Sequence, residues 1–473
     1  MKSFLRPCSL AVAFLCSASL LPAAATAPSA PVRVACVGDS ITAGSGTTLA
    51  ALDSYPSQLQ RMLDPDKWLV GNFGVSGATL LNGGDKPYQK QALFQDALTF
   101  HPDIVIIMLG TNDTKPQNWR LKDRFTADYH DLVAKFKALP GPPRIFLCCA
   151  PVVPGTGNYG LNEAGVLEEI PLIAAIAKEE QAGEIDMHGS LLGHEALLLD
   201  RVHPNTDGAN ILARTVYRAL TGQEFTGTLD PALRAVWHDY TRLNFASGGR
   251  VGSLMLPKTP APGQPWIWRT EFLDTESQGD LALLAQGWHV AYVNVQNMFG
   301  SPASLDAMDT FYAQVVKTYA LNPKVVLEGF SRGGLFAFNW AARHPDRVAS
   351  IYADAPVLDF KSWPAGRGKG QGSKADWQNL LKAYHLTEAE ALAYPLNPVD
   401  NLKPLAGAKI PLLIICGDAD KTVPHDENAL IAQSRYQALG GEVQLIVKPG
   451  GDHHPHSLPD PQPIVEFVLR HAP

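Results

Sequence analysis

The sequence predicts an α/β protein made of two consecutive units, each built on a mostly parallel β-sheet. Short, unbroken apolar runs recur along the chain, and several end in a turn of glycine and polar residues, as Val32–Val37 does before Gly38-Asp39-Ser40. Longer stretches with helical spacing, such as Ala127–Leu139, separate these runs. Buried strands that alternate with helices are typical of parallel sheets covered on both faces. Polar residues at the strand ends then lie where such proteins bind ligands.

The composition excludes several classes of protein. The chain has 473 residues, of which 46% are hydrophobic and 18% are charged, so it can bury sizeable cores. Its formal net charge of −7 argues against a nucleic-acid partner, because phosphate binding needs a concentrated positive surface. After the N-terminal segment, no unbroken apolar stretch is long enough to cross a bilayer, which excludes a protein with several membrane spans.

The N-terminus has the pattern of a secretory signal peptide. Lys2 and Arg6 form a short basic region, Cys8 to Leu21 is apolar, and small residues follow through Ala27. We therefore assign residues 1–27 to a signal peptide and expect a secreted or periplasmic protein with no integral membrane segment after cleavage.

The remaining chain divides into a first unit over residues 28–222, a linker over 223–240 and a second unit over 241–473. The first unit has its clearest apolar runs at Val32–Val37, Ile104–Leu109 and Ile145–Ala150. The linker begins with a stretch rich in Gly, Thr and acidic residues. The second series of runs comprises Val251–Leu256, Trp266–Trp268, His289–Val295, Lys324–Leu327, Ala349–Ala353, Pro411–Cys416 and Val443–Val447.

Four cysteines follow the signal peptide, and all lie in expected strands: Cys36, Cys148, Cys149 and Cys416. They form no Cys-x-x-Cys pair and no Cys/His cluster, so neither zinc nor a redox dithiol is indicated. We read them as small buried apolar residues, while one disulfide stays open in an exported protein. We expect no cofactor and no metal.

The first unit contains a serine, a histidine and an aspartate of the kinds that cleave esters by nucleophilic attack. Ser40 ends a strand where a helix should begin, and Asp200 and His203 stand three residues apart. A histidine can take the serine proton while the aspartate orients the ring and stabilises its cation. Gly77 lies in a turn and Asn112 directly follows a strand, so both can offer N–H groups to a developing oxyanion.

These motifs, in this order, resemble those of the SGNH (GDSL-type) hydrolase family over roughly residues 32–220. The resemblance implies a flavodoxin-like, three-layer α/β/α sandwich. It also implies that Ser40 is the nucleophile, with Asp200 and His203 completing the triad. The oxyanion hole would be formed by the Ser40 N–H, the Gly77 N–H and the Asn112 side chain. Arg201 replaces the glycine that the family often has between the acid and the base.

A second set of residues follows the order serine, acid, histidine. Ser331 lies in Gly329-Phe330-Ser331-Arg332-Gly333, between an expected strand and a helix, which is the pattern of a nucleophile elbow. Downstream acids are Asp418 and Asp420, directly after another strand. The candidate bases come after the last strand and are His453, His454 and His456.

This half resembles the α/β-hydrolase superfamily over roughly residues 240–473, and within it the prolyl-oligopeptidase-like and esterase branches. The resemblance implies Ser331 as nucleophile, Asp420 as the acid with Asp418 as the alternative, and His453 as the base ahead of His454 and His456. The Arg332 N–H would be one oxyanion donor. The second would come from the loop Arg269-Thr270-Glu271-Phe272, which lacks the His-Gly-Gly pattern of many lipases.

Together the two resemblances imply a bifunctional, secreted serine esterase that acts on acylated polysaccharide or oligosaccharide. We expect the first unit to be an acetylesterase for hemicellulose-type polymers. Trp119, Trp266, Trp268 and Trp363 are candidates either for sugar stacking or for core packing. Two alternatives stay open: a lipolytic or aryl esterase, and an esterase whose second unit only binds substrate.

Overall fold

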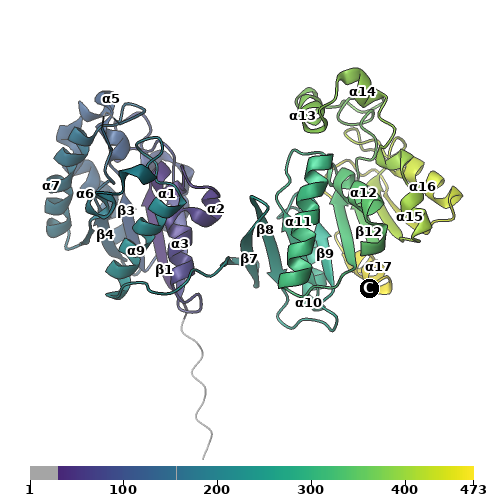
Figure 1. The fold of residues 1–473 in the computed structure, drawn as a ribbon, viewed down its shortest axis with the longest axis horizontal. Helices are drawn as coiled ribbons and strands as arrows, with labels where there is room; N and C mark the ends of the chain where they lie inside the picture. Colours follow the sequence, from purple (N-terminus) through teal and green to yellow (C-terminus); the bar gives the residue numbers. More distant parts are fainter. Residues whose placement is uncertain (1–29, 156) are drawn as a thin grey trace, which may run out of the picture.

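The structure, a computed structural model, describes residues 30–155 and 157–473, and the expected signal peptide lies outside the described residues. The chain forms two α/β units that follow one another along the sequence (Figure 1). The first is built on a five-stranded sheet and the second on a nine-stranded sheet. The predicted fold class, two α/β units each with a mostly parallel sheet, is confirmed.

The first sheet has the strand order β2-β1-β3-β4-β5, and all its neighbouring strands are parallel. The strands are β1 (Val32–Gly38), β2 (Trp68–Gly74), β3 (Ile104–Met108), β4 (Arg144–Cys148) and β5 (Gly183–Ile185). The helices are α1 (Ser40–Ala43), α2 (Ala50–Asp53), α3 (Tyr55–Met62), α4 (Ala92–Thr99), α5 (Pro116–Trp119), α6 (Phe125–Lys137), α7 (Glu163–Glu179), α8 (Met187–Leu191) and α9 (Thr206–Thr221).

Successive residues of β1 enter two different cores, and this makes the first unit a three-layer sandwich. Ala35 and Val37 pack with side chains of α4, α6 and α7. Val34 and Cys36 pack on the opposite face with side chains of α3, α8 and α9. Strand side chains alternate between faces, so an unbroken apolar run requires helices on both sides.

The second sheet has the order β14-β13-β12-β11-β9-β10-β8-β7-β6. Its strands are β6 (Ala232–Trp237), β7 (Tyr240–Ser247), β8 (Arg250–Leu256), β9 (Trp266–Arg269), β10 (His289–Val293), β11 (Val325–Phe330), β12 (Val348–Asp354), β13 (Leu412–Gly417) and β14 (Val443–Lys448). Strands β6, β7, β8 and β10 pair antiparallel, and the pairs from β10 through β14 are parallel.

Helices cover both faces of this sheet as well. They are α10 (Gln278–Ala285), α11 (Pro302–Thr318), α12 (Gly333–Arg343), α13 (Lys374–Tyr384), α14 (Glu388–Leu392), α15 (Lys403–Gly407), α16 (Ala429–Ala438) and α17 (Gln462–Arg470). Helices α11, α12, α15 and α16 contribute to the core on one face, and α10 and α17 to the core on the other. Helices α13 and α14 stand apart from the sheet, at the top of the second unit in Figure 1.

Part of the stretch expected to be a linker is β-structure. Residues 223–231 connect the units, but Ala232–Trp237 form β6 at the edge of the second sheet. Only the two end residues of this strand are buried, and Arg234 and Val236 are exposed. A short edge strand with so little buried surface lacks the apolar run that identifies a central strand.

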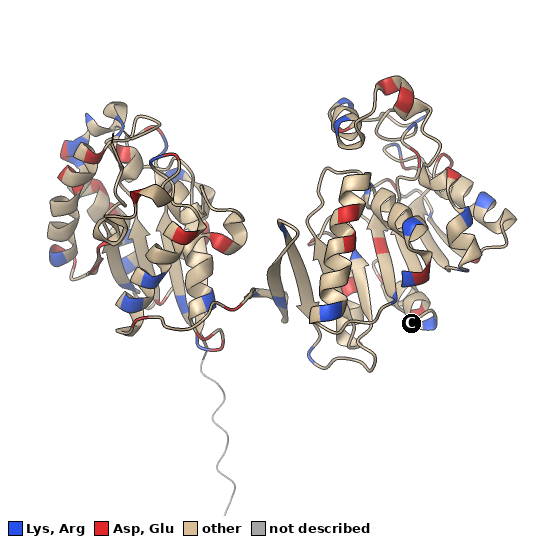
Figure 2. Cartoon of the chain, in the orientation of Figure 1, with Lys and Arg blue, Asp and Glu red and all other residues tan. Residues whose placement is uncertain are grey.

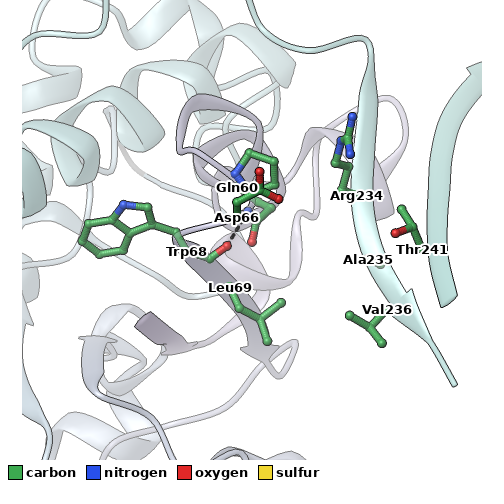
Figure 3. A pocket seen from close by; sticks show the side chains of 9 residues that line it. Gln60, Asp66, Trp68, Leu69, Arg234, Ala235, Val236 and Thr241 are labelled. Carbon is green, nitrogen blue, oxygen red and sulfur yellow. Dashed lines mark hydrogen bonds between the residues drawn. The ribbon is translucent and has the colours of Figure 1, made fainter. Parts of the chain in front are cut away.

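The two units meet where the edge strands of their sheets come close. A cavity of about 110 Å³ lies between Trp68 and Leu69 at the start of β2 and Val236 of β6 (Figure 3). Helix α3 contacts β6 beside it. In the view of Figure 2, acidic and basic residues are interspersed along both units. None of the candidate catalytic residues lines this cavity, so the contact joins the units away from both candidate sites.

A buried ion cluster ties β9 to β11 in the second unit. The Arg269 side chain at the end of β9 is hydrogen-bonded to Asp280 of α10 and lies 3.7 Å from Glu328 of β11. All three side chains are at most 1% exposed, and the guanidinium lies over the Phe330 ring. Removing one partner of such a cluster leaves a buried charge without compensation.

We therefore predict that Arg269→Met lowers the free energy of unfolding of the second unit by about 3–5 kcal/mol. The matched control is Arg343→Met, because Arg343 pairs with Asp306 and Asp309 at the surface, and we expect it to change stability by less than about 1 kcal/mol. Urea unfolding of the full chain measures both. Equal losses for the two variants would contradict the prediction.

Candidate active sites

The structure brings Ser40, His203 and Asp200 into one hydrogen-bonded series. Ser40 is the first residue of α1, directly after β1, and Asp39 caps this helix by accepting the Ile41 N–H. The Ser40 Oγ lies 2.8 Å from His203 Nε2, and His203 Nδ1 lies 2.7 Å from Asp200 Oδ2. This arrangement lets the imidazole take the serine proton while the carboxylate holds the ring.

Asp200 is held as an anion by its neighbours. Its Oδ1 accepts the N–H groups of Val202 and His203, in addition to the contact with the ring. Burial acts to raise the pKa of Asp200, but these hydrogen bonds, with that from the His203 ring, outweigh burial and lower it. The carboxylate therefore stays charged, as a group that stabilises an imidazolium must.

Gly77 and Asn112 lie beside Ser40, as the sequence predicts for oxyanion donors. They line, with Ser40 and His203, a cavity of about 240 Å³. The other lining residues are Ser45, Ser76, Lys115, Tyr159 and Leu161. Gly77 has φ of +80°, which suits glycine, and Asn112 Nδ2 is 3.4 Å from Asp39 Oδ2. The candidate donors thus line one small cavity with the serine.

Three buried carboxyl groups lie under this site and were not predicted from the sequence. They are Asp39, Asp113 and Glu169, each at most 1% exposed. Asp113 accepts the N–H groups of Leu80 and Leu81, in the segment that follows Gly77. Burial raises the pKa of Asp113 to about 7, although these bonds lower it. Asp113 thereby fixes the segment that carries a candidate oxyanion donor.

Glu169 is the most isolated of the three. Within the described part of the chain, neither of its carboxyl oxygens has a hydrogen-bond partner. A Cβ on Gly110 would stand 2.2 Å from Glu169 Oε2, so the glycine makes room for the carboxyl group. Burial, and then the nearby Asp113 and Asp39, hold the pKa of Glu169 well above its usual range. Burial therefore favours the neutral, protonated form of this carboxyl group in the folded chain.

The structure also brings Ser331, His453 and Asp420 together. Ser331 stands between β11 and α12 with φ of +48°, a strained value for a residue with a side chain. Its Oγ lies 2.9 Å from His453 Nε2, and His453 Nδ1 lies 2.8 Å from Asp420 Oδ2. A Cβ on Gly329 would stand 2.9 Å from the Gly333 carbonyl oxygen, which explains the need for glycine in this tight elbow.

The alternative acid and bases have other partners. Asp418 accepts the Gly450 N–H at 2.6 Å, whereas Asp420 accepts the N–H groups of Thr422 and Val423 as well as the His453 ring. His456 Nδ1 lies 3.1 Å from the buried Asp354. His454 is exposed, and its pKa is lowered by partial burial and by the neighbouring histidines.

Among the described residues, His453, His454 and His456 lie close enough together to be considered as ligands of a metal ion. Their ligating atoms lie within 4.8 Å of one another. His453 and His456 are, however, already hydrogen-bonded to the carboxylates of Asp420 and Asp354. Their orientation is thus explained by these carboxylates.

The tryptophans considered for sugar stacking are not placed at Ser40. Trp266 and Trp268 are fully buried in the core of the second unit. Trp363 is buried and packs near Phe299, while Trp119 packs edge-on against Phe125 and donates to Glu168. The interpretation of these side chains as packing residues is the one that fits the structure.

Tyr159 is instead the exposed aromatic side chain at the Ser40 cavity. It is 61% exposed, its ring centroid is 6.0 Å from that of His203, and its hydroxyl lies 3.4 Å from Asp200 Oδ2. Sequence reasoning missed it because a single tyrosine in a Gly-rich loop has no periodicity or motif. The four cysteines of the described chain are buried and free, so the disulfide left open by the sequence is not formed there.

Comparison with known families matches both halves. Residues 36–211 match the model of the GDSL-like lipase/acylhydrolase family, and residues 292–470 match that of the prolyl oligopeptidase family. We call the part of the chain with the first match the GDSL-like half and the part with the second match the prolyl oligopeptidase-family half. The predicted resemblances are thereby confirmed, and each family region contains one of the two serine–histidine–aspartate sets.

Each similar protein matches only part of this chain, and some of the matches also cover less than half of the other protein's length. An acetylxylan esterase of Xylanibacter ruminicola is 37% identical over 208 residues, which are 40% of this chain and 43% of that protein. The acylaminoacyl peptidase of Pyrococcus horikoshii is 16% identical, with 53% of this chain and 44% of that chain covered and a TM-score of 0.39. Est24, a carbohydrate acetylesterase of Sinorhizobium meliloti, is 21% identical, with coverages of 40% and 99% and a TM-score of 0.34.

No helix within residues 30–155 and 157–473 is both long and apolar enough to cross a membrane.

We predict that Glu169→Gln stabilises the GDSL-like half increasingly as the pH rises. With a folded pKa above the unfolded value, the wild type keeps a proton that the unfolded chain releases above about pH 4.3. Its stability then falls by about 1.4 kcal/mol per pH unit until Glu169 ionises in the folded state. The neutral amide removes this loss, so the gain in melting temperature over wild type should be larger at pH 8 than at pH 5.

The matched control is Glu168→Gln, because Glu168 is exposed and paired with Lys122. Its change in melting temperature should not grow with pH. A gain for Glu169→Gln that is the same at both pH values would show that the carboxyl group is already ionised in the folded chain.

Proposed function

We propose that this chain is a secreted serine esterase with two active sites, and that the Ser40 site removes acetyl groups from hemicellulose-type polysaccharide. The observation that carries the proposal is the convergence of a serine–histidine–aspartate series and candidate oxyanion donors on one cavity of about 240 Å³. The name of the Xylanibacter ruminicola relative, acetylxylan esterase, supports the choice of acyl group and polymer.

The Ser40 geometry supports a two-step acyl transfer. His203 Nε2 takes the Ser40 proton as Oγ attacks the acetyl carbonyl, and the oxyanion is held by the N–H groups of Ser40 and Gly77 and by the Asn112 side chain. The histidine then gives the proton to the departing sugar oxygen. Water attacks the acetyl-serine by the same route and releases acetate. Asp200 orients His203 and stabilises its cation throughout.

The size and lining of the cavity favour a short acyl group over a long one. Ser45, Ser76 and Lys115 line it beside Leu161, so polar side chains interrupt its apolar surface. A lipolytic enzyme needs an extended apolar cleft for its acyl chain. We therefore rank the lipolytic or aryl esterase second.

We further propose that Ser331, Asp420 and His453 form a second ester-hydrolysing site. The intact series of hydrogen bonds and the strained elbow support catalysis over a role in substrate binding alone. The proposed domains are a signal peptide over residues 1–27, an esterase unit from residue 28 to about 222, and a second unit that includes β6.

Four proteins test the two sites: wild type, Ser40→Ala, Ser331→Ala and the double variant. We expect Ser40→Ala to lower acetate release from acetylated xylan by about a thousandfold or more. Ser331→Ala should leave that rate unchanged and lower hydrolysis of a small aryl acetate, and the double variant should lose both. Acetate assays measure each rate.

Full activity of Ser40→Ala on xylan would overturn the assignment of the first site. Loss of every activity in Ser40→Ala alone would make the second unit an accessory, or an enzyme for another ester.

Tyr159 gives a test of the polysaccharide assignment. An exposed ring beside the serine can stack on a sugar ring, a contact worth about 1 kcal/mol. We expect Tyr159→Ala to raise the KM for acetylated xylan about threefold to tenfold, with little change for a small aryl acetate. Tyr159→Phe keeps the ring and removes the hydroxyl near Asp200, so it should behave as wild type. A polymer KM unaffected by the alanine would remove the stacking role.

A further inference from the structure

The loop after β9 is attached to the nucleophile elbow of the second site by short hydrogen bonds. The Thr270 N–H donates to the Glu328 carbonyl at 3.0 Å, and the Thr270 hydroxyl lies 2.9 Å from the carbonyl oxygens of Glu328 and Gly333. These contacts fix the loop against the residues on either side of Ser331. They also occupy the Thr270 N–H, so this group is not available to bind an oxyanion.

The next amide along the loop, that of Glu271, lies beside the elbow. A Cβ on Gly333 would stand 3.3 Å from Glu271 Cβ and 3.7 Å from Glu271 N. Phe272, which follows, has φ of +55°, so the chain turns sharply directly after Glu271. Over the described residues, the N–H groups of Glu271 and Arg332 donate to no protein acceptor.

The side chains of these same two residues form a buried ion pair. Arg332 Nη2 lies 3.0 Å from Glu271 Oε1, and the side chains are 11% and 1% exposed. The guanidinium also lies between the Phe272 and Phe299 rings, 5.0 Å and 5.6 Å from their centroids. A planar cation held in this way has little freedom, so it restricts the residue to which it is paired.

Burying the Glu271 and Arg332 side chains costs free energy, and only part of this cost is offset by the contact between them. Burial raises the pKa of Glu271 to about 7, even though Arg332 acts to lower it. Within the described chain, Glu271 Oε2 and Arg332 Nε are buried without a hydrogen-bond partner. Well-packed apolar residues would stabilise the fold at least as well as such an incompletely bonded pair, so its stability contribution alone does not explain its presence.

We propose that the Glu271 N–H is the second oxyanion donor of the Ser331 site and that the Arg332–Glu271 ion pair positions it. The proposal rests on Ser331 being the nucleophile. Arg332 would supply the first donor through its own N–H. The side chains of the two donor residues thus hold their backbones at a fixed separation, in place of the His-Gly-Gly pattern that this loop lacks.

The two N–H groups bind the oxyanion from the attack of Ser331 until the carbonyl re-forms. As Ser331 Oγ bonds to the ester carbon, its proton passes to His453 Nε2 and the carbonyl electron pair moves onto oxygen, where the two N–H groups bind it. When the carbonyl re-forms, the bond to the alcohol oxygen breaks and His453 returns the proton to that oxygen. The ion pair touches neither substrate nor reacting atoms, so Arg332 and Glu271 act through their side chains as positioning residues.

The test uses the full chain with Ser40→Ala, so that Ser331 alone reports. Glu271→Ala removes the ion pair, and Glu271→Gln keeps an oxygen for Arg332 without the charge. Asp376→Asn is the matched control, because Asp376 of α13 lies 3.5 Å from the other arm, Nη1, of the same guanidinium. The readouts are kcat and KM for a small aryl acetate, and the rate at which a fluorophosphonate probe labels Ser331.

We expect Glu271→Ala to lower kcat and the labelling rate about tenfold to a hundredfold, with KM within about threefold of the parent. The kcat of Glu271→Gln should lie between those of Glu271→Ala and the parent. The kcat of Asp376→Asn should stay within about threefold of the parent. If the alanine variant does not fold, the glutamine variant carries the test, with a kcat about threefold to tenfold below the parent at unchanged KM.

Several results would overturn the proposal. One is a parent-like kcat in Glu271→Ala, or, where that variant does not fold, in Glu271→Gln. Another is an equal loss in Asp376→Asn, which would show that Arg332 merely supports the fold. Failure of the second site itself looks different: the parent would neither hydrolyse the acetate nor be labelled at Ser331, and both proposals would fall together.

Discussion

Parallel pairing of buried strands is the constraint on which both candidate sites depend. Strands β1 and β11 each lie inside their sheet with parallel neighbours on both sides, so their carboxyl ends meet the ends of adjacent strands along one edge. Ser40 follows β1 and Ser331 follows β11. The backbone groups at such an edge have left the ladder, and loops from neighbouring strands arrive there. A serine, a histidine and oxyanion donors can therefore converge although they are far apart in the chain.

The two candidate sites place the acid, the base and the oxyanion donors on different kinds of structural element. In the GDSL-like half, the candidate acid and base share one short segment, and one candidate oxyanion donor is the side chain of Asn112, which lies against Asp39. In the prolyl oligopeptidase-family half, the candidate acid follows β13 and the candidate base follows β14, while the serine is held in a strained turn. Its candidate oxyanion donors are backbone groups, so the position of a loop, rather than of a side chain, sets their geometry.

Both halves contain buried carboxyl groups, and the free-energy cost of burying these groups differs. Within residues 30–155 and 157–473, Asp113 and Glu169 have no cation partner, and burial raises the pKa of both groups. Asp280, Glu328 and Glu271 lie beside buried arginines, which offset part of the desolvation. Asp113 accepts two N–H groups of the segment after Gly77, and Glu271 lies in the loop after β9, so these two carboxyl groups restrain segments that carry candidate oxyanion donors at some cost in stability.

The sequence by itself determined the α/β class, the central strands, both serines and the two family resemblances, because these depend on local patterns of apolar runs and glycine turns. It ranked Asp420 over Asp418 and His453 over its neighbours by resemblance alone. Only the tertiary structure showed that His453 contacts Ser331 and that Asp420 contacts His453. The edge strands β2 and β6, the exposed Tyr159 and the contact between Glu271 and Arg332 were likewise decided by packing. Periodicity reports which face of a local element is buried, whereas a contact between segments 61 residues apart depends on how the whole sheet brings two loops together.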